Sequence, residues 1–223
     1  MQIMIKRILK LLLPKFVRQW LVAIRKRIRY TARKYILKAE IRKNTPLKII
    51  VGAAETHQQG WFSTNEQWLD ITSEDQWHRF FGDRQLIRCI VAEHVFEHLT
   101  EAGALAALES MNKRLAPGGK IRIAVPDGYN PEPEYIRHVG IGGIGDDASD
   151  HKQLLNKDSL SKLMITAGLT VQHIEGYTKD GELITNQWHA DDGFIRRSRQ
   201  NNSKESWNFP DAATSLIVDG SKP

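Results

Sequence analysis

Two glutamate–histidine pairs, Glu93-His94 and Glu97-His98, follow an apolar run at residues 87–92. Histidine titrates near neutral pH and a carboxylate accepts or holds protons, so these residue types suit acid–base chemistry. The apolar run is typical of a buried strand in a parallel sheet. Since open α/β folds bind ligands at the carboxyl ends of such strands, we expect Glu93 and His94 to face a ligand.

The same stretch also matches H-x-x-E-H, a helical zinc motif of one class of metalloproteases. We predict that the chain is helical over residues 93–99. This would place His94 and His98 on one face, with Glu97 available to activate a zinc-bound water. Glu175 is the candidate third ligand, although it lies beside a predicted strand rather than on a helix. A zinc peptidase is therefore a third interpretation, and we assign no metal ligand.

The chain beyond residue 46 alternates between strand-like and helix-like patterns. Helices that separate short apolar strands indicate an α/β layered fold, and the turn-rich end of the chain indicates antiparallel pairing there. The only cysteine, Cys89, lies within an apolar strand, which predicts a buried thiol. Strands are predicted at residues 47–51, 61–65, 68–72, 87–92, 120–126, 169–174 and 214–218, and helices from Ser73 and over residues 101–115 and 158–168.

The first predicted strand runs directly into residues 52–54, Gly-Ala-Ala, whose small size lets a ligand approach the backbone closely. Glu66 is spaced to hydrogen-bond ribose hydroxyls, and Asp70 is placed to face a ribose or an adenine. Two of these features have a plainer interpretation. The loop with its single glycine is then an ordinary strand–loop junction, and Glu66 is a solvated loop residue.

Longer segments carry a resemblance to a known family. AEHVFEHL and LAPGGKIRIAVPDGYNPEPEYI, followed by a helix ending in AGL and a further strand, resemble class I S-adenosylmethionine-dependent methyltransferases. More narrowly, residues 47–222 are similar to the bacterial "predicted SAM-dependent methyltransferase" family. The resemblance implies a Rossmann-like α/β sandwich with a mostly parallel sheet, an antiparallel C-terminal strand and S-adenosyl-L-methionine as cofactor. The roles it implies are Gly52 and Ala54 beside the methionine part of the cofactor, Glu66 at the ribose, Asp70 and Ile71 beside the adenine, and Glu93 and His94 next to the methyl group.

Methyl transfer from a sulfonium is an in-line displacement, so positioning would do most of the work in such an enzyme. A hydroxyl or amine acceptor also loses a proton, and His94 or Glu93 is a suitable base. The loop has one glycine and the first crossover is short. The alternative is therefore a degenerate methyltransferase fold that serves as a non-catalytic binding or assembly module. Further candidates for acceptor binding are Asp127, Tyr129, His151 and Arg196.

Charge divides the chain into a basic extension, residues 1–46, and a methyltransferase-like domain, residues 47–223. The extension holds 14 of the 32 Lys and Arg residues and one of the 26 acids, Glu40, so its net charge is +13 and that of the domain is −7. Its apolar residues recur in steps of three and four, which predicts a basic amphipathic helix kinked or divided at Pro14. No uncharged run approaches the roughly 18 residues of a membrane span.

A helix of this kind suits an anionic membrane surface, and it equally suits packing on the domain or on a partner protein. We expect no nucleic-acid partner, because no aromatic stacking surface or reading motif accompanies the charge. The resemblance implies a cytoplasmic methyltransferase whose acceptor is a small molecule, a saccharide or a lipid-linked precursor. If the basic helix binds a membrane, the enzyme is peripheral at its inner face; the alternative is a helix that binds the domain or a partner.

Overall fold

The computed structural model describes residues 14–54, 56–145, 147–201 and 215–223. The chain forms two compact units, residues 1–39 and 40–223. The predicted extension, residues 1–46, contains the whole of the first unit, and its first thirteen residues lie outside the described part of the chain.

The described part of the first unit belongs to one long helix, α2 (Lys15–Lys43). It begins directly after Pro14, whose carbonyl accepts a hydrogen bond from the Arg18 amide at 3.1 Å. A proline is tolerated at this point because the first amides of a helix have no partner within the helix. Large apolar side chains stay exposed along α2, among them Phe16, Trp20, Val22, Ile28, Tyr35 and Ile36.

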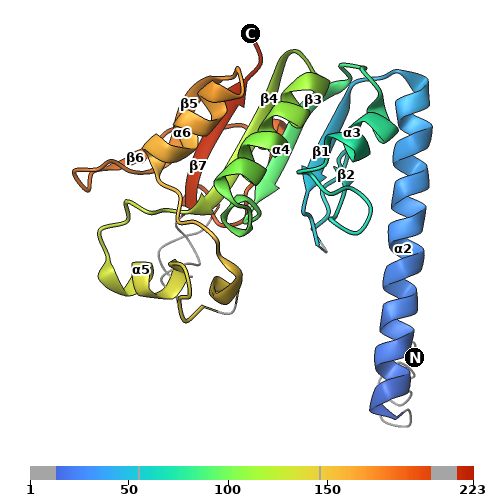
Figure 1. The fold of residues 1–223 in the computed structure, drawn as a ribbon, viewed down its shortest axis with the longest axis horizontal. Helices are drawn as coiled ribbons and strands as arrows, with labels where there is room; N and C mark the ends of the chain where they lie inside the picture. The colour runs from blue at the N-terminus through green and yellow to red at the C-terminus, as the bar shows by residue number, and fades with distance from the viewer. Residues whose placement is uncertain (1–13, 55, 146, 202–214) are drawn as a thin grey trace. The chain divides into compact units, whose positions relative to one another are not determined.

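The second unit is built on a seven-stranded sheet of order β2-β1-β3-β4-β7-β5-β6 (Figure 1). β2, β1, β3 and β4 run parallel, while β7 runs antiparallel to both β4 and β5. This confirms the predicted mostly parallel sheet with an antiparallel C-terminal strand. The strands are β1 (Leu47–Val51), β2 (Phe62–Ser63), β3 (Ile87–Glu93), β4 (Leu115–Pro126), β5 (Thr170–Tyr177), β6 (Leu183–Thr185) and β7 (Ser215–Ser221).

Three helices cover one face of the sheet, α3 (Glu74–Phe81), α4 (Glu101–Arg114) and α6 (Lys157–Thr166), with α4 between the other two (Figure 1). Each begins at a polar cap: the side chains of Ser73, Thr100 and Asn156 accept hydrogen bonds from the first-turn amides. The sequence predicts the cap at Ser73. A short helix α5 (Pro133–Val139) and the 3₁₀ turns η1 (Phe96–His98), η2 (Ala148–Asp150) and η3 (Ala190–Asp192) lie in the connections.

The opposite face of the sheet is covered largely by irregular chain. Residues 186–201, called the strap from here on, bring Trp188 and Ile195 against this face, and Trp61 joins them. Both strap residues are almost fully buried, so the strap forms part of the hydrophobic core. The strands contribute Ile50, Cys89, Val91, Ala124, Ile174 and Ile217 to this cluster.

A buried ion pair fastens the strap to the sheet. Arg122 of β4 donates to both carboxylate oxygens of Asp219 on β7, at 2.7 and 2.8 Å, and each residue is 1% exposed. The same guanidinium donates to the carbonyl of Gly193 at 2.7 Å and lies 4.8 Å from the centre of the Trp188 ring. Arg122 therefore binds the buried Asp219 carboxylate and, in the strap, both the Gly193 carbonyl and the Trp188 ring.

Two sequence predictions are wrong. Residues 93–99 are not an α-helix: β3 continues to Glu93, the amide of His94 still bonds the Ala124 carbonyl of β4, and the three-residue η1 turn follows. Residues 68–72 are not a strand, because the Asp70 carboxylate accepts hydrogen bonds from the amide and hydroxyl of Thr72 and closes a turn. The predicted burial of Cys89 is confirmed, and burial raises the pKa of its thiol.

Candidate functional site

A cavity of about 170 Å³ lies at the carboxyl ends of β1 and β3, under the strap. Four of the predicted site residues, Gly52, Ala54, Glu93 and His94, line it. The others in its wall are Ile50, Val51, Ala53, Thr56, Val91, Asp147, Phe194, Arg196 and Arg197. The cavity therefore joins the glycine loop and the first glutamate–histidine pair at the edge where open α/β folds bind ligands.

Gly52 lets the ends of β1 and β3 come together. Its φ is +57°, a left-handed conformation that suits glycine, and a Cβ on it would lie 2.5 Å from Cγ2 of Val95. Val95 follows Glu93 and His94 in the chain, so this close approach sets the position of both side chains relative to the loop.

Glu93 is held by the strap. Its carboxylate accepts hydrogen bonds from the Arg197 amide at 2.9 Å and from Nε of Arg196 at 3.3 Å, and its side chain is 6% exposed. The wall of the cavity therefore carries two acids, Glu93 and Asp147, and two arginines, Arg196 and Arg197. This charge set suits a ligand that carries both an anionic and a cationic group.

His94 has neighbours at both ring nitrogens. Nε2 lies 3.1 Å from Oγ of Ser215, and Nδ1 lies 3.2 Å from Nη1 of Arg197. Since a guanidinium only donates, Nδ1 accepts this bond, and Nε2 carries the proton and donates to Ser215. The φ of His94 is +54°, an uncommon backbone conformation for a residue with a side chain.

The remaining predicted cofactor residues, Glu66, Asp70 and Ile71, are not in the wall of the cavity. Glu66 is exposed, Ile71 is buried, and the Asp70 carboxylate is bound in its turn with Thr72. A residue that the sequence analysis overlooked, Asn65, is buried at the end of the β2 segment, and its Oδ1 has no hydrogen-bond donor among the described residues. The available signal was a polar residue at the last position of a predicted strand, 61–65.

Asn65 follows Thr64, whose backbone is hydrogen-bonded to the chain around Gly52. The amide of Ala53 donates to the carbonyl of Thr64 at 2.8 Å, and the amide of Thr64 donates to the carbonyl of Ile50 at 2.8 Å. The loop after β1 and the chain after β2 are therefore joined immediately beside Asn65.

Of the candidates for acceptor binding, only Arg196 lines the cavity. Asp127 is buried at the end of β4, where its carboxylate accepts the amides of Tyr129 and Tyr177, and burial raises its pKa. The Tyr129 hydroxyl donates to Asp158, and His151 belongs to a separate cluster beside η1.

Glu175, on β5, is not near a partner that would make it a zinc ligand. Its carboxylate accepts the Arg199 amide at 2.9 and 3.0 Å, it is 3% exposed, and burial raises its pKa to about 7. The metal-type cluster of the described residues does not include it. Glu175 thus holds the end of the strap rather than a metal.

Glu175→Gln is expected to stabilise the protein at alkaline pH. The raised pKa means that folded Glu175 keeps its proton while the unfolded chain loses it, so its contribution to stability is full below about pH 4.5 and is lost as pH rises towards 7. Glutamine keeps an oxygen for the Arg199 amide and avoids the buried charge. The free energy of unfolding of the variant, relative to wild type, should rise by about 2–3 kcal/mol between about pH 5 and pH 8 in urea titrations.

The solvent-exposed acid Glu182, replaced by glutamine in the same way, is the control and should show no such pH-dependent difference. Equal unfolding curves for wild type and Glu175→Gln at both pH values would contradict the assignment of a proton to folded Glu175.

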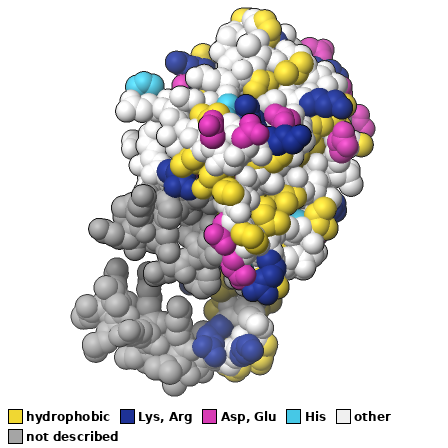
Figure 2. Space-filling model, turned by 90° about the vertical axis from the view of Figure 1, so that its left-hand side faces the viewer, with side chains coloured by type: hydrophobic (Ala, Val, Ile, Leu, Met, Phe, Trp, Pro, Cys, Tyr) yellow, Lys and Arg dark blue, Asp and Glu magenta, His cyan; other side chains and the backbone are white. Residues whose placement is uncertain are grey.

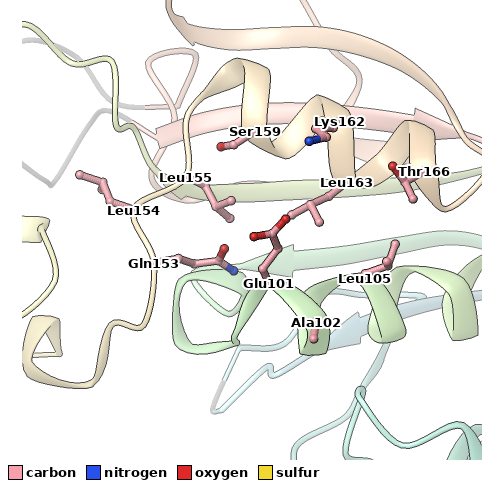
Figure 3. A pocket seen from close by; sticks show the side chains of 10 residues that line it. All are labelled: Glu101, Ala102, Leu105, Gln153, Leu154, Leu155, Ser159, Lys162, Leu163 and Thr166. Atoms are coloured by element: carbon pink, nitrogen blue, oxygen red, sulfur yellow. The ribbon is translucent and has the colours of Figure 1, made fainter.

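A larger hollow of about 670 Å³ lies between α4 and α6 (Figure 3). Figure 3 shows Glu101 of α4 pointing towards α6, with Lys162 and Ser159 on the other wall. Its remaining lining is mostly apolar and it contains no acid–base pair that is in contact. Size therefore does not mark the site, and the smaller cavity at the carboxyl edge is the better candidate.

The family model for a methyltransferase domain matches residues 25–174, more than half of the chain. No curated protein matches the sequence. Among solved structures, a SAM-dependent methyltransferase of Archaeoglobus fulgidus is 10% identical, with a TM-score of 0.47 over 85% of this chain and 94% of that one. A SAM-dependent methyltransferase of Thermotoga maritima, described as a possible histamine N-methyltransferase, is 10% identical, with a TM-score of 0.46 over 90% and 96%.

Proposed function

Because the chain belongs to the family of methyltransferase domains, we propose that it binds S-adenosyl-L-methionine in the cavity under the strap and methylates an acceptor at the same edge of the sheet. The observation that carries the proposal is the contact of Glu93 with Arg196 and Arg197 at the end of β3. The cofactor supplies an activated methyl group, and the protein supplies its position.

The donor set of the cavity fits the methionine end of this cofactor. That end carries an ammonium and a carboxylate, for which Glu93 and the two arginines are complementary in charge. Gly52 and Ala54 themselves carry no bulky side chain. The buried Oδ1 of Asn65, which has no donor among the described residues, is an acceptor suited to a ribose hydroxyl.

The volume of the cavity bears on how the cofactor enters. About 170 Å³ is below the roughly 300 Å³ at which small-molecule sites usually begin. We therefore expect Arg196 and Arg197 to leave Glu93 and His94 when the cofactor enters, and to bind the cofactor instead.

His94→Gln should stop methylation while cofactor binding persists. When Arg197 moves away, Nδ1 of His94 becomes available to accept the proton of a hydroxyl or amine acceptor.

A second candidate is a non-catalytic binding module with a methyltransferase fold. The same small cavity favours it, because the strap arginines already satisfy the acid that the cofactor would need. Cofactor binding separates the two functions.

Calorimetric titration of the full-length protein with S-adenosylhomocysteine is expected to show saturable binding at one site. Glu93→Gln should weaken this binding by about 10–100-fold, because a charged partner of the ligand ammonium becomes neutral. The exposed acid Glu109 on α4, replaced by glutamine, is the matched control and should bind as wild type does. No heat of binding at about 1 mM ligand would support the binding module instead.

We further propose that the basic extension brings the enzyme to an anionic membrane surface on the cytoplasmic side, where the acceptor is a saccharide or a lipid-linked precursor. The exposed apolar residues of α2 and the +13 charge of residues 1–46 support this. None of the described helices is long and apolar enough to cross a membrane. On the face of the molecule that Figure 2 shows, the coloured side chains are a mixture of acidic, basic and apolar ones, so no similarly basic surface is seen among them.

Flotation with vesicles is expected to recover the protein with phosphatidylserine-containing vesicles and not with purely zwitterionic ones. Recovery should fall as salt rises, since screening weakens the attraction of the basic residues. Trp20→Ser should lower recovery several-fold, because Trp20 is 61% exposed on α2. Ile165→Ser, at a similarly exposed residue of the other unit, is the control. Equal recovery with both vesicle types would exclude the membrane proposal.

A further inference from the structure

Three side chains of the kinds that bind metal ions meet where η1 contacts the chain after η2. The Glu97 carboxylate and a ring nitrogen of each of His98 and His151 lie within 4.8 Å of one another. The two histidine rings meet edge to face with their centres 4.9 Å apart. The amides of Lys152 and Gln153 donate to the carbonyl of Glu97 at 2.8 and 3.3 Å, so the backbone fixes the two segments side by side.

The Glu97 carboxylate is buried without a hydrogen bond. The residue is 1% exposed, and neither carboxylate oxygen has a donor among the described residues. Nδ1 of His94 lies 3.0 Å from Oε1, but that nitrogen already accepts the guanidinium bond of Arg197. A buried carboxylate without a partner costs several kcal/mol, and a bound cation would remove that cost.

His151 is held as metal-binding histidines usually are. Its Nδ1 lies 2.7 Å from the carbonyl of Val139, an acceptor, so Nδ1 carries the proton and the lone pair is on Nε2. The residue is 8% exposed, so its neighbours also restrict the ring. Next to it, Oδ2 of Asp150 lies 3.3 Å from Nδ1 of His98, the carboxylate–histidine arrangement that orients a ligating imidazole.

We propose that Glu97, His98 and His151 bind a divalent transition-metal ion, for which Zn²⁺ is the best-suited candidate. Two imidazoles and one carboxylate are a known donor set for zinc and leave a fourth position open. Bonds of about 2.0–2.2 Å place tetrahedral ligand atoms about 3.4 Å apart. The partly exposed His98 side chain has room to close that distance.

This site differs from the helical zinc motif that the sequence suggests. His94 is not a ligand, and the third ligand is His151, which lies beyond α5 in the chain. The ion would join η1 to the 147–153 segment, and Asp147 of that segment lines the cavity under the strap. Metal binding would therefore fix one wall of the proposed methyltransferase site, and it does not depend on that function being correct.

The test uses the full-length protein, free of affinity tags. After removal of metal with EDTA and dialysis, calorimetric titration with ZnCl₂ should show one site per chain, and the midpoint of thermal unfolding should rise when Zn²⁺ is added back. The metal-free protein loaded with Co²⁺ should show the visible absorption bands of a low-coordinate site.

Glu97→Gln and His151→Asn should each weaken Zn²⁺ binding at least about 100-fold, since each removes one of three ligands. His98→Ala, at the least buried of the three residues, tests the site if the buried variants fail to fold. The control is His78→Ala, which removes a surface histidine 3.6 Å from the exposed Asp83 and should leave the affinity unchanged. Folded Glu97→Gln or His98→Ala with wild-type affinity would overturn the proposal, as would wild-type protein that takes up no ion.

Discussion

Arg122→Met is expected to lower the free energy of unfolding by about 3–5 kcal/mol, the range for removing one partner of a buried ion pair. The variant leaves the Asp219 carboxylate, 1% exposed, without the two bonds of 2.7 and 2.8 Å that now satisfy it. It also removes the bond to the Gly193 carbonyl and the contact with the Trp188 ring, so the strap loses its attachment to the sheet. Urea denaturation at neutral pH measures the loss.

The control for Arg122 is Arg137→Met. Arg137 also forms a close pair with an acid, Glu134, but the two side chains are 63% and 54% exposed, so the change should cost less than about 0.5 kcal/mol. The double variant Arg122→Met, Asp219→Leu should regain much of the lost stability, because it removes the buried carboxylate, which would keep only Lys120, 3.5 Å away, as a partner among the described residues. A small effect of Arg122→Met on the unfolding free energy would show that the pair does not hold the strap.

Gly52→Val is expected to abolish binding of S-adenosylhomocysteine, with an increase of at least about 100-fold in Kd, and to cost about 2–4 kcal/mol of stability. A Cβ at this position would lie 2.5 Å from Cγ2 of Val95, and a β-branched residue at φ +57° is strained in any surroundings. Both effects displace the ends of β1 and β3 that carry the cavity.

Gly60→Val separates strain from displacement. Gly60 also has a positive φ, +79°, but nothing lies within 4 Å of a Cβ placed there. It should lose about 1–2 kcal/mol of stability and keep its affinity for S-adenosylhomocysteine. Calorimetry and urea denaturation on both variants provide the comparison, and equal affinities for Gly52→Val and wild type would show that the cavity is not the cofactor site.

The strands of the sheet core could be predicted because each is a short apolar run, which is visible in the local sequence without knowledge of the neighbouring strands. Residues 47–51 and 87–92 are buried from both sides, which makes them nearly continuous in hydrophobicity, and Ser73 announces its helix by a cap. The position of Glu93 and His94 at a carboxyl edge follows from the same pattern, and the structure places them in one cavity with Gly52.

What could not be predicted depends on contacts between distant parts of the chain. The chain at His94 leaves β3 in a left-handed conformation, and its amide bonds the carbonyl of Ala124, thirty positions away, whereas local spacing alone favours a helix. The proximity of Glu97 to His151 results from the path of the chain around α5, and no local pattern encodes it. The strap has no hydrophobic periodicity, so its sequence does not indicate which side chains face the cavity. Arg196 is a candidate for acceptor binding in the sequence analysis, and Arg197 is not.

The strap is at once the second wall of the hydrophobic core and the roof of the cavity, and this has a thermodynamic consequence. Moving Arg196 and Arg197 away from Glu93 displaces chain next to Ile195, which is fully buried. If the strap opens to admit a ligand and closes again over it, opening exposes apolar surface to water. The opening step then has a positive heat-capacity change. A plot of the logarithm of the ligand association rate against reciprocal temperature should therefore be curved, and amide protons of the strap should exchange with solvent far sooner than those of β3 and β4.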